Sequence, residues 1–496
     1  MIKPRHPALY QVNTRVWLTA LGKGLGRPAT LDDVPDAELD HFAALGFDWI
    51  WFLSVWQTGP AGQQVSRGNA QWRKGFAETL PDLRDDDIGG SGFAICAYSV
   101  SARMGGNDAL ARLRDRLKRR GLRLLLDFVP NHVGLDHAWV DARPELFVSS
   151  ATDAGETFLK KTAAGTRWLA HGKDPFFLAW TDTVQLDYRN PATYTAMIEQ
   201  LQSIARRCDG VRCDMAMLVL KDVFAKNWEN FPTANLPAET EFWADAVQTA
   251  KKSQPDFLFL AEVYWDLEAR LQDLGFDYTY DKRWYDYLIA RNYPETQRHL
   301  FSLTSQFLNA SAHFLENHDE HRIASKLNWP EHQAALLAMT SLPGMRLFHE
   351  GQLTGARKFC PVELGRRPDE SVQTDIAAHY EKLLGALQTS GIGRGHGELL
   401  CPNRAWSDNP TDQNFILVQW QEQARSFDLA AVNLAPHAGQ CYAPLTIDGL
   451  ENYNWQLIDL LGTERYERNG DDLKRQGLYL DVPAHGAQLF HFEPIP

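Results

Sequence analysis

Residues 122–129 of this chain read LRLLLDFV, and this run constrains the fold more than any other segment. It is almost continuously apolar and too short for a buried helix, as is typical of a strand covered on both faces in a parallel sheet. An amphipathic stretch at residues 107–120, with leucines spaced three and four residues apart, comes directly before it and stops at Gly121. A helix followed by a fully buried strand is the repeating unit of α/β folds.

The same pairing recurs along most of the chain. Further strand-like runs occur at residues 48–53, 257–263, 312–315 and 344–348. Helical stretches occur at residues 36–45, 240–251 and 331–340. Units of roughly 30–60 residues repeated over about 390 residues predict an α/β fold built on a (β/α)8 TIM barrel. A doubly wound open sheet is the competing architecture, but no GxGxxG motif or P-loop follows any of these strands, which disfavours it.

Three segments interrupt the repeat and suggest the domain organisation. Residues 57–92 are polar and rich in Gly, Asp and Arg, which predicts a long loop. Residues 133–183 contain no clear barrel strand, and from about residue 402 short strand-like runs alternate with turn residues, as in an all-β sandwich. We therefore predict a catalytic barrel of residues 1–132 and 184–395, a subdomain inserted after its third strand at 133–183, and a C-terminal β-sandwich domain at 396–496.

Charge and composition narrow the class of partner. The net charge of −13 disfavours nucleic acid, whose phosphates need a basic surface. No stretch approaches the roughly 18–20 apolar residues that cross a bilayer, and the first residues lack the apolar segment of a signal peptide. The six cysteines form no CxxC pair, which favours a reducing compartment. We expect a cytoplasmic protein that binds neither nucleic acid nor membranes, and the sequence leaves its oligomeric state open.

Several polar residues stand where the predicted barrel strands end. Because the carboxyl ends of all strands of such a barrel open on one rim, we expect these side chains to converge. A charged residue at the end of one strand is common, and an isolated Arg-x-Asp is more often a structural ion pair. The set as a whole is more informative than any member. Its members are Asp127, His132, Arg212, Asp214, Glu262, His318 and Asp319.

Such a rim can cleave a glycosidic bond. Two carboxylates about 5–5.5 Å apart cleave it with retention, one as the nucleophile and the other as the acid that protonates the leaving oxygen. Arg212, two residues before Asp214, favours the ionised form that a nucleophile needs. Glu262 follows four apolar residues, which predicts a raised pKa suited to proton transfer. We expect a third acid, Asp319, to hold the sugar hydroxyls with nearby histidines.

These segments resemble the α-amylase family of glycoside hydrolases over most of the chain. The similar motifs, in matching order, are DFVPNH at 127–132, GVRCD at 210–214, LAEVY around Glu262 and ENHD at 316–319. The resemblance implies that Asp214 is the nucleophile, Glu262 the general acid and base, and Asp319 the stabiliser of the transition state. The substrate-binding set that it implies, with Asp127 helping to hold the site together and Tyr98 as an aromatic platform, is Tyr98, Asp127, His132, Arg212 and His318.

The chain also departs from common family members. Ala97 precedes Tyr98 where an Asp is usual, and Met215 and Ala216 follow Asp214 where many α-amylases carry Lys-His. The second change disfavours endo-acting starch hydrolysis but leaves the chemistry at the bond intact. The reaction requires no cofactor and no metal, and the one ion that the resemblance suggests is Ca²⁺ at Asn131, which would need six to eight oxygen ligands.

We therefore expect a retaining glycoside hydrolase that acts on α-glucans or malto-oligosaccharides through a covalent glycosyl-enzyme. A transglycosylase or an α-glucoside isomerase similar to trehalose synthase would use the same residues, because a sugar hydroxyl and water compete for one intermediate. A third alternative is a non-catalytic carbohydrate-binding homologue, although such a protein would be expected to have lost one of the three acids. Linkage and chain-length preference are left open.

Overall fold

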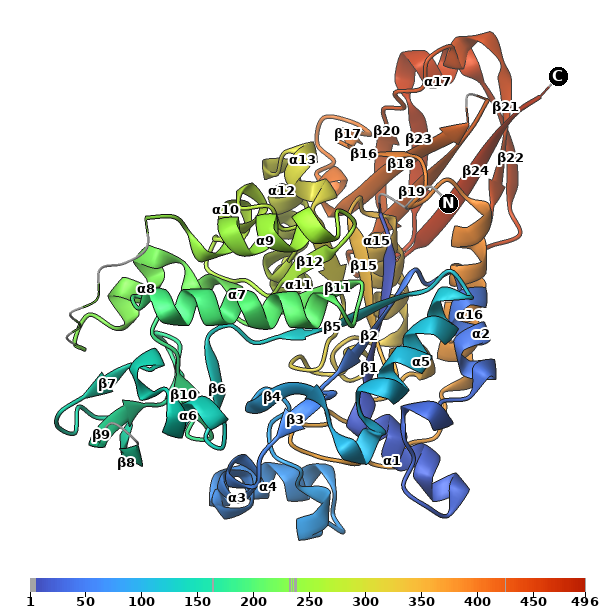
Figure 1. Cartoon of the computed structure of the whole chain (residues 1–496). Coiled ribbons are helices and arrows are strands. Elements are labelled where there is room, and N and C mark those ends of the chain that lie inside the picture. The colour runs from blue at the N-terminus through green and yellow to red at the C-terminus, as the bar shows by residue number, and fades with distance from the viewer. Residues whose placement is uncertain are drawn as a thin grey trace.

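The computed structural model describes residues 6–162, 165–231, 233, 235, 239–423 and 425–495. Within these residues, eight parallel strands close into a barrel in the order in which they follow one another along the chain (Figure 1). This closed barrel confirms the predicted α/β architecture. The barrel strands are β1 (Ala8–Asn13), β2 (Trp49–Leu53), β5 (Arg123–Phe128), β11 (Gly210–Cys213), β12 (Leu258–Ala261), β13 (Tyr278–Tyr280), β14 (Ser311–Phe314) and β15 (Met345–His349).

Helices connect the strands and pack around the barrel (Figure 1). Helix α5 shows why: Leu110, Leu113 and Leu117 share one face and are all buried, and the helix is followed by Gly121, whose φ of 78° suits glycine. Helix α15 is buried along most of its length and begins with a capping box between Asn328 and Glu331. The longer helices are α1 (Thr14–Leu25), α2 (Asp36–Ala44), α5 (Gly106–Lys118), α7 (Pro191–Ala205), α9 (Phe242–Ser253), α11 (Lys282–Ile289), α12 (Tyr293–Ser302), α15 (Trp329–Ser341) and α16 (Thr374–Thr389).

The expectation of a long loop at residues 57–92 is wrong. This segment contains two helices, α3 (Pro60–Gly68) and α4 (Ala70–Thr79), after the short strand β3 (Trp56–Thr58). Asn69 caps α4 by accepting hydrogen bonds from two of its first N–H groups, and Phe76 is buried in a small apolar cluster. A few apolar side chains thus dock α4, although its composition is mostly polar.

A small subdomain lies between β5 and β11. It is closed at its base by antiparallel pairing of β6 (His132–Gly134) with β10 (Thr183–Gln185). Between them lie α6 (Ala138–Ala142) and a sheet of three strands. Figure 1 shows this sheet and α3–α4 at the end of the barrel away from the C-terminal strands. The strands of the sheet are β7 (Ser149–Ser150), β8 (Thr157–Thr162) and β9 (Gly165–Ala170).

The C-terminal strands form two sheets that share one apolar core, which confirms the predicted sandwich. Phe415 and Leu429 enter this core from the larger sheet, and Cys441 and Leu480 enter it from the smaller one. The indole of Trp420 donates a hydrogen bond of 2.7 Å to the carbonyl of Ser341, at the end of α15. The larger sheet contains β16 (His396–Leu400), β18 (Phe415–Gln423), β19 (Ser426–Asn433), β24 (Ala487–Ile495), β21 (Asn454–Asp459) and β22 (Arg465–Asn469), and the smaller one β17 (Asn403–Arg404), β20 (Gly439–Ala443) and β23 (Leu478–Val482).

Two further observations bear on the environment of the protein. Among the described residues, no helix combines the length and apolar character that a membrane crossing needs. The six cysteines, all of which lie in described segments, are free thiols.

Candidate active site

Two carboxylates follow neighbouring strands at the carboxyl end of the barrel. Cys213 and Ala261 are paired in the ladder between β11 and β12, and each is followed directly by an acid, Asp214 or Glu262. The backbone N–H of Asp214 donates to Phe128 at 2.9 Å, and the N–H of Glu262 donates to Cys213 at 3.0 Å. These two hydrogen bonds extend the strand ladder by one residue, and they therefore fix the backbone positions of both acids.

Arg212 joins these two acids through its planar guanidinium. Its Nη1 lies 2.7 Å from Asp214 Oδ1, and its Nη2 lies 2.7 Å from Glu262 Oε2. Because both nitrogens belong to one guanidinium, the two contacted oxygens are within about 8 Å of each other. The Arg212 side chain is fully buried, with the rings of Trp51 and Phe93 at 5.4 and 5.3 Å from its central carbon. Little solvent thus screens this charge from the two acids.

Glu262 receives two further hydrogen bonds. The backbone N–H of Met215, a residue with a φ of 41°, donates to Oε2 at 2.7 Å, and the hydroxyl of Tyr264 donates to Oε1 at 2.8 Å. Burial is the largest influence on the pKa of Glu262 and raises it to about 7, although Arg212 opposes the shift. Glu262 is therefore suited to exchange a proton near neutral pH.

The other two acids differ in exposure. Asp214 is buried, and this burial raises its pKa while Arg212 opposes the rise and favours the ionised form. The Asp319 side chain is 45% exposed, and its Oδ2 lies 3.9 Å from Arg212 Nη2. Three carboxylates thus share one buried arginine, and Asp319 keeps an open face toward solvent.

His318 lies between Asp319 and the first barrel strand. Its Nε2 is 3.1 Å from Asp319 Oδ2, and its Nδ1 is 2.7 Å from the amide nitrogen of Gln11 on β1. An amide nitrogen donates, so Nδ1 accepts and the ring hydrogen is on Nε2, whose contact with Asp319 does not have the geometry of a hydrogen bond. Burial holds the pKa of His318 well below its usual value, which keeps the ring neutral.

Asp127 supports the site from β5. It accepts hydrogen bonds from the Trp51 indole at 2.9 Å and the Ser54 N–H at 2.8 Å, and burial raises its pKa to about 6. The Asp127 carboxylate therefore fixes Trp51, one of the rings beside Arg212.

Tyr98 and His132, the two remaining predicted binding residues, are also buried. The hydroxyl of Tyr98, on β4 (Ile95–Val100), donates to the Val129 carbonyl at 3.0 Å and accepts from the Val129 N–H at 2.9 Å. His132 packs against the Trp180 ring at 5.1 Å, and burial lowers its pKa to about 3, so that its ring is neutral. Their roles toward a substrate stay predictions.

Sequence reasoning missed Gln11, Trp51 and Tyr264, which orient the predicted residues. Gln11 is a polar side chain inside the buried run ALYQVN, and the two aromatic residues carry donors that need acceptors when they are buried. These features could have marked all three as partners of a polar site.

The side chain of Asn131, the residue at which calcium is expected, already has a partner in a neighbouring amide. Its side-chain oxygen accepts a hydrogen bond of 3.0 Å from Gln185 Nε2. Within the described segments, no group of three or more His, Cys, Asp or Glu side chains is placed to hold a metal ion. Calcium binding at Asn131 stays a prediction.

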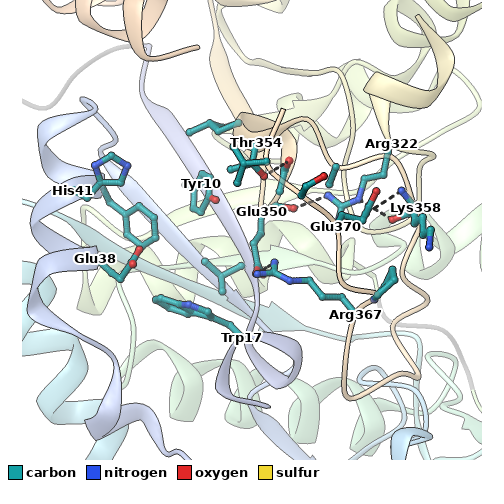
Figure 2. A pocket seen from close by; sticks show the side chains of 18 of the residues that line it. Tyr10, Trp17, Glu38, His41, Arg322, Glu350, Thr354, Lys358, Arg367 and Glu370 are labelled. Atoms are coloured by element: carbon teal, nitrogen blue, oxygen red, sulfur yellow. Dashed lines mark hydrogen bonds and ion pairs between the residues drawn. The ribbon is translucent and has the colours of Figure 1, made fainter. Parts of the chain in front are cut away.

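A cavity of about 350 Å³ lies behind strand β1 (Figure 2). Tyr10 and Val12 line it, whereas Gln11, between them, contacts His318, as the alternation of side chains along a strand requires. Figure 2 shows Arg367 beside Glu350 on the wall that faces Trp17. Glu350 Oε2 also accepts a hydrogen bond of 3.0 Å from the Asn13 N–H. This cavity thus borders the back of the strand that positions His318.

Most of the chain is similar to known proteins. Residues 36–382 match the family model for the alpha amylase catalytic domain. The chain is 24% identical over 270 residues to a salivary alpha-glucosidase of Aedes aegypti, a match that covers 51% of this chain and 41% of that protein. It is 26% identical over 247 residues to a trehalose synthase/amylase of Mycobacterium tuberculosis, covering 46% of this chain and 35% of the relative. The chain thus spans less than half the length of these two relatives.

The fold has solved counterparts over its full length. A noncanonic maltogenic alpha-amylase from Thermotoga neapolitana superposes with a TM-score of 0.69, covering 99% of each chain at 16% sequence identity. At this identity the likeness concerns the fold alone.

Proposed function

The chain belongs to the α-amylase family, and on this premise we propose that it is a retaining glycoside hydrolase acting on α-glucosidic bonds of malto-oligosaccharides or α-glucans. The observation that carries the proposal is the contact of one buried arginine, Arg212, with both Asp214 and Glu262. It brings together two buried carboxyl groups whose pKa values are raised by burial and lowered by Arg212, and the pKa of Glu262 is about 7. Retaining glycosidases need such a pair.

In the proposed reaction, an ionised oxygen of Asp214 attacks the anomeric carbon. Glu262 gives its proton to the glycosidic oxygen, so that the leaving sugar departs as an alcohol and a covalent glycosyl-enzyme forms. Glu262, now ionised, then takes a proton from water, which attacks the same carbon and releases Asp214.

Asp319 and His318 are proposed to bind the sugar at the cleaved bond. Asp319 exposes nearly half of its side chain, and one of its oxygens lies 3.1 Å from His318 Nε2. Both can hydrogen-bond the ring hydroxyls, and Asp319 carries the negative charge that stabilises a cationic transition state. Neutral His132 and the support of Asp127 complete the proposed binding set, with Tyr98 as a further wall.

A second candidate, transfer to a sugar hydroxyl, is favoured by the similarity to the trehalose synthase/amylase. The same glycosyl-enzyme would be opened by a sugar instead of water, so the two acids act identically. Product analysis with maltose separates the two: hydrolysis converts each maltose into two molecules of glucose, whereas transfer gives a trisaccharide with one glucose released, or a new disaccharide when the leaving glucose itself is the acceptor.

The proposal is tested with the variants Asp214→Asn and Glu262→Gln. Each should lower kcat by several orders of magnitude on a natural α-glucoside while the melting temperature stays near that of the unchanged protein. A slowly hydrolysed fluorinated glucosyl fluoride should label the peptide that contains Asp214. Asp86→Asn, at a fully exposed carboxylate, is the matched control. Near-normal turnover by either active-site variant would exclude the assignment, and absence of turnover in the unchanged protein would favour a non-catalytic homologue.

We also propose a cytoplasmic location, supported by the free thiols. The net charge of −13 supports an uncharged sugar substrate over nucleic acid.

A further inference from the structure

The cavity behind β1 is separated from the candidate active site by the strand itself. Tyr10 and Val12 line the cavity, whereas Gln11 contacts His318 on the other side of the strand. Residues of α1, of α2 and of the segment 350–372, which follows β15, form the remaining walls. Its volume of about 350 Å³ is within the range of small-molecule sites. A molecule in this cavity would therefore be distinct from a sugar bound at the three acids.

One wall of the cavity is aromatic. The ring of Phe42 lies 4.8 Å from the ring of Tyr10 and 6.1 Å from that of Trp17, measured between centroids. All three residues line the cavity, and they come from α2, β1 and α1. Rings held by three different elements form a stable apolar surface, against which the C–H face of a sugar ring can pack.

The opposite wall is charged and held in place by ion pairs. Arg367 forms an ion pair with one carboxylate oxygen of Glu350. Arg322 donates to the backbone carbonyl of Glu350 at 2.5 Å and to the carboxylate of Glu316 at 2.8 Å. Figure 2 shows Arg322, Glu350 and Arg367 together on this side of the cavity. These side chains are therefore positioned before any ligand binds, which lowers the entropic cost of binding.

The charges around the cavity are balanced. Three carboxylates and three cationic side chains line it, and the other titratable residues are Tyr10 and His41. A ligand with a net charge would disturb this balance, whereas a neutral ligand with several hydroxyls can hydrogen-bond to groups of both signs. The carboxylates are those of Glu38, Glu350 and Glu370, and the cations are those of Arg322, Lys358 and Arg367.

Tyr10 carries a polar group that the protein leaves without a partner. The residue is only 8% exposed, and its hydroxyl makes no hydrogen bond to any residue that the structure describes. Burial, followed by the negative charge of Glu350, raises the pKa of Tyr10, so the hydroxyl keeps its proton. A buried hydroxyl without an acceptor is unfavourable. A hydroxyl oxygen of a ligand in the cavity would supply that acceptor.

We propose that this cavity is a second sugar site, which binds one molecule of glucose or maltose. The apolar face of the sugar packs on Trp17 and Phe42, and its hydroxyls face Tyr10 and the pair of Glu350 and Arg367. The choice of these two sugars rests on the proposed function, because the proposed reaction releases them. The aromatic wall, the balanced charges and the free hydroxyl support a neutral sugar independently of catalysis.

The test is a calorimetric titration with glucose in the presence of saturating acarbose, a pseudo-tetrasaccharide that is too long for the cavity. One molecule of glucose should still bind per chain. Tyr10→Phe should weaken this binding by about fivefold and leave the melting temperature unchanged, since the hydroxyl has no partner in the protein. Ser371→Trp, at an exposed serine that lines the cavity, should weaken it by more than about tenfold. Tyr453→Phe, at a 41% exposed tyrosine of the C-terminal domain, is the control and should not change it.

Two results would overturn the second site. One is the loss of all glucose binding when acarbose is present, which would assign the glucose to the active site. The other is unchanged glucose binding in both Tyr10→Phe and Ser371→Trp. The proposed function is tested separately with Asp214→Asn, which should lose turnover but keep the glucose binding that acarbose does not displace. Retained turnover in Asp214→Asn would overturn the proposed function and not the second site.

Discussion

Arg212 Nη2 lies 2.7 Å from Glu262 Oε2, although Arg212 belongs to the strand that carries the other acid, Asp214. The arginine therefore acts on both acids at once. It offsets the burial that would otherwise keep Asp214 protonated, and it limits the rise in the pKa of Glu262.

Replacing this arginine should affect the two acids together. In Arg212→Met, two buried carboxyl groups lose their cation, so Asp214 retains a proton to higher pH. We expect kcat/KM to fall by at least about 10²-fold and the acid limb of its pH profile to move upward. In Arg212→Lys, which keeps a positive charge, the acid limb should move upward by less than in Arg212→Met. An unchanged acid limb in folded Arg212→Met would contradict this account.

We expect kcat/KM to fall both at high pH and at low pH, because the two acids must be in opposite protonation states. Glu262 must carry its proton to act as an acid, so the rate should fall as pH rises through about 7. Asp214 must be ionised to attack, so the rate should also fall at low pH, at a value above that of a free aspartate because burial raises its pKa. Glu262→Gln, assayed with α-glucosyl fluoride, should lose the alkaline limb. An alkaline limb that persists in this variant would assign it to another group.

Tyr264→Phe tests the hydrogen bond of 2.8 Å to Glu262. The hydroxyl donates to the ionised carboxylate, so its removal should raise the pKa of Glu262 and move the alkaline limb upward by about half a unit to one unit. The loss in maximal kcat should be less than about tenfold. A limb that moves to lower pH would show that the hydroxyl favours the protonated form instead.

The C-terminal domain provides a prediction about stability. His491 Nδ1 lies 2.7 Å from Asp428 Oδ1, and this contact raises the pKa of His491. Its added stability should be fully present below pH 6.5 and decrease as pH rises through the folded pKa. His491→Gln should therefore cost about 1 kcal/mol at pH 5.5 and less at pH 9, measured by chemical unfolding. His437→Gln, at an exposed histidine of the same domain, should show no such trend.

The sequence predicted most strongly those elements whose burial is uniform. Strands β5 and β12 follow continuous apolar runs, because both of their faces are covered. Strand β1 was missed because its apolar run is interrupted by Gln11, whose side chain contacts His318, and by Asn13, whose side chain caps α1. Strand β13 was missed because YTY is short, and only the closed barrel specifies it.

In the candidate site, too, some features could be predicted from the sequence and others could not. The three acids could be located because strand ends of a barrel converge whatever lies between them in sequence. The contacts of Tyr264 and Arg212 with Glu262 depend on rotamers and on ladder register, which no local pattern specifies. The exposure of the rings in the loop 173–178 could not be predicted either, because an apolar residue in sequence is normally taken as part of a core.

The pairing of Cys213 with Ala261 has a consequence for engineering this protein. Since each of the two carboxylates proposed to act on the bond follows its ladder position by one residue, the separation of their backbone positions is set by the barrel and not by the neighbouring insertions. Transplanting other segments in place of 173–178 or of α8 (Lys221–Asn227) should thus redirect which acceptors and chain lengths are used, without disturbing the distance across which the glycosidic bond is cut.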